Sequence, residues 1–196
     1  MELFKNIRLN IGKSILEKKE ARTKRKVFYS NFSMTKSIGI VWDASIISDF
    51  PALSRFYQKM HEKNIEVKIL GYFPGKELPN QYTAVRYLTC LRKADLNFFY
   101  HPVSSETDSF IRNKYDILID INFKKLFPLQ IISSLSNASF KVGLFDSGTS
   151  TDLFDLMMEI NNPVDVDNYL NQVIHYLEMI NSGNTNTKTT VQTVIK

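Results

Sequence analysis

Positively charged side chains are concentrated near the start of this sequence of 196 residues. Residues 1–36 contain ten Lys or Arg and three Glu, whereas residues 37–196 contain fifteen basic and seventeen acidic residues. Several basic side chains in one run can neutralise a polyanion and release its counterions. The densest run, KKEARTKRK at positions 18–26, supplies six candidate nucleic-acid contacts: Lys18, Lys19, Arg22, Lys24, Arg25 and Lys26. The alternative is a solvated helix that only keeps the protein soluble.

Apolar residues in the same region recur with the period of a helix. The pattern predicts a helix over residues 2–26, although Gly12 lowers its propensity by roughly 1 kcal/mol relative to Ala. One face of this helix carries Leu3, Phe4, Ile7, Ile11 and Ile15. This stripe must be covered by the body of the protein, by a partner protein or by an anionic membrane surface.

Polar residues also follow the predicted strands, where a second kind of chemistry is possible. Acidic and hydroxyl side chains at such positions could hold a ribose or sugar hydroxyl. They are equally common as helix caps and turn formers. The candidate ligand-binding residues are Asp43, Ser45, Tyr72, Asp120, Asn122 and Asp146.

The sequence nominates no catalytic residue, metal ligand or cofactor. It lacks the GxGxxG and GxxxxGK[ST] phosphate loops, the GxSxG elbow and the HExxH zinc motif. The segment DSGTS at 146–150 resembles an aspartic-protease motif, but it occurs once and follows a strand of an α/β pattern, so a turn is expected. Cys90 is the only cysteine, which excludes disulfide scaffolds and thiolate zinc sites.

Strand-like and helix-like segments alternate along the rest of the chain. Strands are predicted over 37–42, 65–72, 82–91, 116–121, 140–145 and 153–160. Helices are predicted over 48–63, 126–135 and 166–180, with short helical turns in 94–113. Parallel strands joined by crossover helices are the arrangement that this alternation favours.

The predicted fold is α/β: a three-layer Rossmann-like sandwich with a mostly parallel sheet, preceded by a basic amphipathic N-terminal helix. We expect a helical arm and connector over 1–36, a Rossmann-like domain over 37–181 and a polar, disordered tail over 182–196. Ligands of such sheets bind beyond the carboxyl ends of the strands, where the strand order reverses.

Three stretches of the sequence carry a resemblance to a known family. KSIGIVWDA (36–44), KYDILIDINFKKLFPLQIISSLSNASFKVGLFD (114–146) and HYL (175–177), with the basic leading helix, resemble a family of uncharacterised Bacteroidota proteins carried as a domain of unknown function. The resemblance covers most of the chain. It implies a fold and a bacterial cytoplasmic setting but no catalytic residues.

A weaker, partial similarity involves YDILIDI and SNASFKVGLF. These segments are similar to part of the N-terminal, Rossmann-like half of heptosyltransferase-like glycosyltransferases, with Asp120 and Gly143 at the matching strand ends. In those enzymes the nucleotide-sugar is held mainly by the second half. The similarity therefore implies a related fold but not active glycosyl transfer.

These observations favour a non-catalytic binding module of the cytoplasm, whose basic N-terminal helix contacts RNA or a ribonucleoprotein. One alternative is a degenerate nucleotide-sugar-binding domain that uses the strand-end residues. Another is attachment of the amphipathic helix to a membrane surface or a partner protein. No stretch of about twenty apolar residues is present, so no membrane span is expected.

Overall fold

The computed structural model describes all residues except 1, 24, 30, 146–152, 160–164 and 181–196. Its centre is a six-stranded sheet in the order β3-β2-β1-β4-β5-β6, in which every pair of neighbours is parallel. The strands are β1 (Ser37–Asp43), β2 (Glu66–Phe73), β3 (Leu88–Arg92), β4 (Ile117–Ile121), β5 (Phe140–Leu144) and β6 (Leu156–Met158). The predicted α/β sandwich with a parallel sheet is confirmed.

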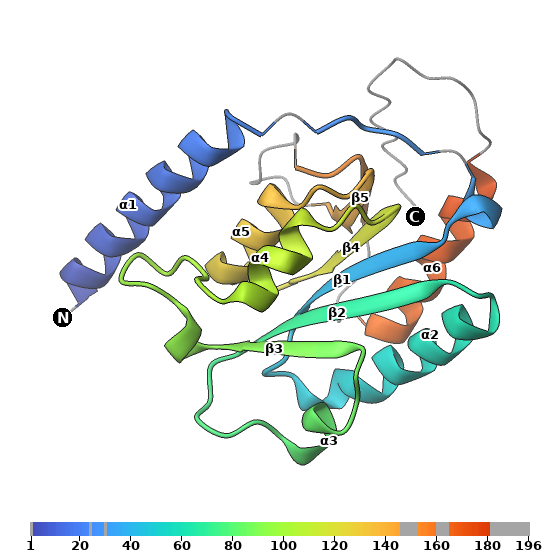
Figure 1. The fold of residues 1–196 in the computed structure, drawn as a ribbon, viewed down its shortest axis with the longest axis horizontal. Coiled ribbons are helices and arrows are strands. Elements are labelled where there is room, and N and C mark those ends of the chain that lie inside the picture. The colour runs from blue at the N-terminus through green and yellow to red at the C-terminus, as the bar shows by residue number, and fades with distance from the viewer. Residues whose placement is uncertain (1, 24, 30, 146–152, 160–164, 181–196) are drawn as a thin grey trace.

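Helices cover both faces of this sheet (Figure 1). They are α1 (Glu2–Glu20), α2 (Phe50–Glu62), α3 (Asn80–Thr83), α4 (Ser105–Arg112), α5 (Phe127–Leu135) and α6 (Val166–Met179). Three short 3₁₀ turns also occur, at Phe32–Met34, Ile47–Asp49 and Lys93–Asp95. Helices α2 and α6 pack on one face, α4 and α5 pack on the other, and α1 lies outside α5.

Alternating side chains of the central strands explain why both faces are covered. In β1, Ile40 and Trp42 point to the core under α2 and α6, whereas Val41 points to the core under α4 and α5. All five residues of β4 are buried. Strands that are apolar on both sides need a layer of helices above and below them, as is usual for parallel sheets.

The strand order reverses between the two most central strands. β1 pairs with β2 on one side and with β4 on the other, so Val41 lies between Leu70 and Asp120. The segments after β1 and β4 therefore leave this edge of the sheet in different directions. This is the position at which open α/β sheets bind ligands.

Three predicted elements differ clearly from the structure in length. The strand predicted over 153–160 is only three residues long, as β6 (Leu156–Met158). The first helix ends at Glu20 rather than residue 26. The hydroxyl of Thr23 donates a hydrogen bond to the carbonyl oxygen of Lys19. The backbone N–H of Thr23 donates another to the carbonyl oxygen of Glu20. A threonine that bonds a nearby carbonyl in this way competes with helix continuation.

The predicted strand over 82–91 divides into helix α3 and the shorter strand β3. Tyr82 is the reason for the division, because its ring packs edge-on against Trp42 and its hydroxyl donates to the carbonyl of Ala44. This burial fixes a turn of helix where local propensity favours a strand.

Within the described residues no helix is long and apolar enough to cross a membrane.

Candidate functional site

Helix α1 is docked on α5 through a face that the sequence pattern did not identify. Leu16 is buried against Phe127 and Ile131, and Leu9 packs at the edge of the same cluster. Gly12 lies at the closest point: a Cβ there would lie 2.5 Å from the carbonyl oxygen of Phe99. The glycine that weakens the isolated helix is thus the residue that lets two backbones approach.

A buried histidine completes this contact. Nε2 of His101 lies 2.8 Å from the carbonyl oxygen of Gly12, and Nδ1 is buried without a hydrogen-bond partner among the described atoms. The carbonyl can only accept, so Nε2 carries the proton. Burial lowers the pKa of His101, and the charge of Lys19 acts in the same direction. His101 is therefore a neutral structural donor that holds α1.

Most of the candidate nucleic-acid contacts are open to solvent. Lys18, Lys19, Arg22 and Lys26 are exposed. Among the described residues, no acidic side chain forms an ion pair with any of these four. Lys24 lies outside the described residues. The structure therefore leaves four cations available on a short stretch after the docked part of α1.

Arg25 differs from the other basic residues because its charge is used inside the molecule. Its guanidinium donates two hydrogen bonds of 2.7 Å to the carboxylate of Asp155, and both side chains are almost buried, with 14% and 13% exposed. The same guanidinium donates to the carbonyl of Ser139, as does the backbone N–H of Phe28. Arg25 therefore anchors the connector to the body, a role that a charge pattern alone does not reveal.

Next to this anchor lies a buried lysine. Nζ of Lys141 donates to the carbonyls of Ser133 and Ser134, at 2.6 and 2.9 Å, in the last turn of α5. A cation at this position satisfies carbonyls that lack helical partners. Burial, followed by the charge of Arg25, lowers the pKa of Lys141 to about 7. The side chain thus caps α5.

The strand-end candidates are only partly brought together. Asp43, at the end of β1, is 2% exposed at its side chain; its Oδ1 accepts from the hydroxyl of Ser45 at 2.6 Å. Its Oδ2 has no hydrogen-bond partner in the described structure and faces Nζ of Lys124 at 3.7 Å. Tyr72 is paired with Asp43 in the sheet, and its pKa is raised by burial and then by the Asp43 charge.

Asp120 does not join this rim. Its carboxylate accepts from the hydroxyl of Ser133 on α5 and from the backbone N–H of Asn122. Burial raises the pKa of Asp120 to about 6. Because β4 alternates between the two faces of the sheet, the side chain lies between β4 and α5 rather than beyond the strand end.

Asn122 has a structural role in the loop that follows β4. Its amide donates to the carbonyl of Leu126 at 3.0 Å and its carbonyl accepts from the same residue's N–H at 2.8 Å. Asp146 lies outside the described residues. The strand-end rim of the described chain therefore consists of Asp43, Ser45, Tyr72 and Lys124, of which the sequence identified the first three.

The charges at this rim disfavour a phosphate. Asp49, directly before α2, is near enough to Asp43 that burial and then this second carboxylate raise its pKa. Dinucleotide-binding sheets place the phosphate at this same junction of first strand and helix, where backbone N–H groups are free. Asp43 faces Lys124, whereas Asp49 forms no ion pair within the described residues. The negative charge of Asp49 therefore repels a phosphate, and the rim favours a ligand that donates hydrogen bonds.

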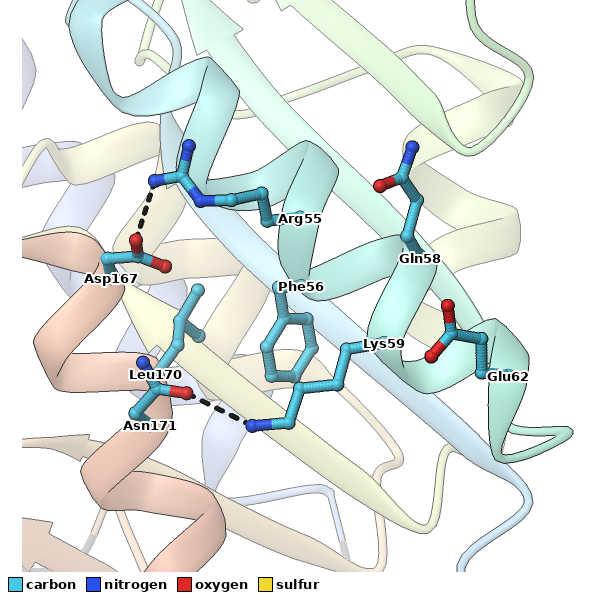
Figure 2. Close-up of a pocket in the computed structure, with 8 residues that line it drawn as sticks. All are labelled: Arg55, Phe56, Gln58, Lys59, Glu62, Asp167, Leu170 and Asn171. Atoms are coloured by element: carbon cyan, nitrogen blue, oxygen red, sulfur yellow. Dashed lines mark hydrogen bonds and ion pairs between the residues drawn. The ribbon is translucent and has the colours of Figure 1, made fainter.

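A shallow groove lies elsewhere, between α2 and α6 (Figure 2). Its volume is about 400 Å³, and its sides are joined by Arg55 with Asp167 at 2.6 Å and by Lys59 with Asn171 at 3.2 Å. Both pairs are exposed, and such contacts contribute little to stability. Arg55 and Lys59 are thereby each held by a partner on α6, whereas Gln58 and Glu62 line the α2 side of the groove (Figure 2). No cluster of three or more His, Cys, Asp or Glu able to hold a metal occurs in the described residues.

The strand order and the two helical layers define the class: this is a Rossmann-like α/β protein whose first loop lacks a phosphate cradle. Within that class, the chain belongs to a family of unknown function (DUF6913), whose model matches residues 8–180. This confirms the resemblance to an uncharacterised domain. No curated protein matches the sequence.

Proposed function

We propose that the protein is a non-catalytic binding module that contacts RNA, alone or in a ribonucleoprotein, through its basic segment, Lys18–Lys26. The observation that carries the proposal is the exposure of four cations, none paired with an acidic side chain of the described chain: Lys18, Lys19, Arg22 and Lys26. We place the module in the bacterial cytoplasm, with the Bacteroidota proteins that it resembles. The division at residues 36 and 181 remains a prediction.

The surroundings of the basic segment support this proposal. Docking of α1 holds its beginning, and the Arg25 to Asp155 pair holds its end, so the charges lie on an ordered support. Ordering before binding reduces the entropy lost on association. Phe28 follows the basic segment and is 58% exposed. An exposed aromatic ring beside phosphate-binding cations can stack on a base.

The test is RNA binding by a charge-neutralised variant. Lys18, Lys19, Arg22 and Lys26 are replaced by Gln, and affinity for a single-stranded RNA of about twenty nucleotides is measured by fluorescence anisotropy. We expect at least a tenfold loss, because each lost phosphate contact removes a counterion-release contribution. Arg25 is left intact so that the connector stays anchored.

A matched control separates the position of the charges from net charge. Four exposed lysines on and after α2 are replaced by Gln: Lys59, Lys63, Lys68 and Lys76. Helix α2 lies across the molecule from α1 (Figure 1). We expect this control to retain most of the affinity. Equal losses in the two variants, or no RNA binding by the unmodified protein, would contradict the proposal.

A second candidate function rests on Oδ2 of Asp43 at the strand-end rim, which is buried, forms no hydrogen bond within the described residues and faces Nζ of Lys124 at 3.7 Å. An unsatisfied buried carboxylate oxygen is a strong acceptor for a ligand hydroxyl. Together with the partial similarity to glycosyltransferases, this supports binding of a sugar moiety, whereas the phosphate of a nucleotide-sugar is disfavoured there. Thermal-shift screening of sugars and nucleotide-sugars tests it: stabilisation lost in Asp43→Asn supports the site, and none in the screen contradicts it.

A further inference from the structure

We propose that the outward face of α1 rests on an anionic lipid surface. This face, here called the outer stripe, consists of Phe4, Ile7 and Ile11, with the half-buried Ile15 at its end. The first three side chains are 73%, 47% and 42% exposed. Their spacings of three and four residues place them on one side of the helix.

The outer stripe is separate from the face that docks α1. Leu9, Gly12 and Leu16 contact the body, and these positions are turned away from the outer stripe by the helical period. Figure 1 shows α1 at the edge of the molecule, with α5 on its inner side only. The body therefore holds the helix in place while the apolar residues remain outside.

One flank of the outer stripe is also fixed by the body. The guanidinium of Arg8 lies 4.1 Å from the ring centre of Phe98 and donates to its carbonyl at 2.7 Å. Phe98 is itself 64% exposed. An exposed aromatic ring of the neighbouring loop is therefore held beside α1 through Arg8.

The charges of α1 decide which partner fits this surface. The helix carries five basic and three acidic residues, and the basic segment continues beyond its end. A second copy would bring two sets of like charges together, which disfavours self-association. The outer stripe also spans only about 17 Å, at 1.5 Å per residue, shorter than a coiled coil needs.

Anionic lipid satisfies both features of the surface. Its headgroups attract Lys and Arg, and the acyl boundary accepts apolar side chains to a depth of about 5–10 Å. RNA could use the charges but offers nothing to Phe4, Ile7 and Ile11. With so few apolar residues, binding should be weak and reversible.

The experiment is co-sedimentation of the full chain with vesicles. One set contains equal parts of phosphatidylglycerol and phosphatidylcholine, and the other contains phosphatidylcholine alone. The test variant combines Phe4→Ser, Ile7→Ser and Ile11→Ser, all at exposed positions. The control combines Met34→Ser, Ile47→Ser and Met179→Ser, which are exposed apolar residues of other elements.

We expect the protein and the control to bind the anionic vesicles and the test variant to bind at least tenfold less. Circular dichroism verifies that the variants stay folded. Equal binding by the test variant, or equal binding to neutral vesicles, would overturn the proposal. A concentration-dependent dimer that the test variant abolishes would assign the outer stripe to a second copy instead. RNA affinity should be unchanged in the test variant, so this result is independent of the RNA proposal.

Discussion

Replacing Gly12 by Ala should destabilise the protein, although the same change stabilises an ordinary helix. In an exposed helix, Ala is favoured over Gly by about 0.8–1.0 kcal/mol. Here the added Cβ would lie 2.5 Å from the carbonyl oxygen of Phe99 and 3.0 Å from the ring of Phe127. A backbone oxygen cannot move aside as a side-chain end can, so α1 must shift away from the segment at Phe99 and from Phe127 of α5.

The size of this destabilisation follows from the contacts that the shift of α1 would break. Exposing Leu16, now 4% exposed, loses about 1.5–3 kcal/mol, and the hydrogen bond from His101 to Gly12 contributes about 0.5–1.5 kcal/mol. After subtracting the helical gain, a net loss of about 1–4 kcal/mol in the free energy of unfolding is expected. Urea denaturation followed by circular dichroism measures it.

Ser14 provides the control for this experiment, since it lies exposed in the same helix. Ser14→Ala should raise stability by about 0.5 kcal/mol through propensity alone. If Gly12→Ala proves as stable as the unmodified protein, or more stable, the close approach of α1 to the body is wrong. The basic segment would then lack the fixed support that the proposed function uses.

Three further predictions concern buried ionisable groups. Burial raises the pKa of Asp120 in the folded protein to about 6, above its ordinary value of 3.8. The free energy of unfolding should therefore fall by up to about 3 kcal/mol as the pH rises from 4 through 6. Asp120→Asn should flatten this fall in urea titrations. Burial lowers the pKa of His101 below its ordinary value of 6.5. The stability that neutral His101 contributes above pH 6.5 should therefore be lost as the pH falls through the lowered pKa. His101→Gln, which keeps a donor for Gly12, should remove that loss in the same titrations. A double-mutant cycle of Arg25→Gln with Asp155→Asn should give a coupling of about 1.5–3 kcal/mol, and a value near zero would refute the anchor.

Local sequence patterns were sufficient to predict the sheet and the helical layers of this fold. The apolar runs of β1 and β4 are long enough to mark strands buried on both faces, and the spacing of Phe50, Leu53 and Phe56 marks one side of α2. These elements obey short-range periodicity, which the sequence displays directly. Their parallel arrangement follows from the crossover helices between them.

The contacts of the N-terminal region could not be predicted in the same way. Arg25 meets Asp155 across 130 positions of the sequence, and nothing near either residue indicates the pairing. The more continuous stripe of α1, with Phe4, Ile7 and Ile11, is exposed, while the face that docks contains a glycine. Hydrophobic periodicity weighs side-chain size, so it missed a contact that depends on the absence of a side chain.

Asp120 shows a related difference at the candidate site. Its place near the end of an apolar strand suggested a ligand position, and the alternation of β4 instead directs it to α5, where Ser133 supplies the hydroxyl. Which helix residue meets a strand depends on the crossover geometry, and the local sequence does not encode that meeting. For Asp43 the last residue of the strand does reach the rim.

The most direct test of the account is the salt dependence of RNA affinity. For single-stranded nucleic acid, the logarithm of the association constant falls with the logarithm of salt concentration with a slope of about −0.7 per phosphate contact. Contact by Lys18, Lys19, Arg22 and Lys26 predicts a slope near −3, reduced by about half in Lys18→Gln with Lys19→Gln. A slope that these two changes leave unaltered would contradict the claim that the basic segment is the binding surface.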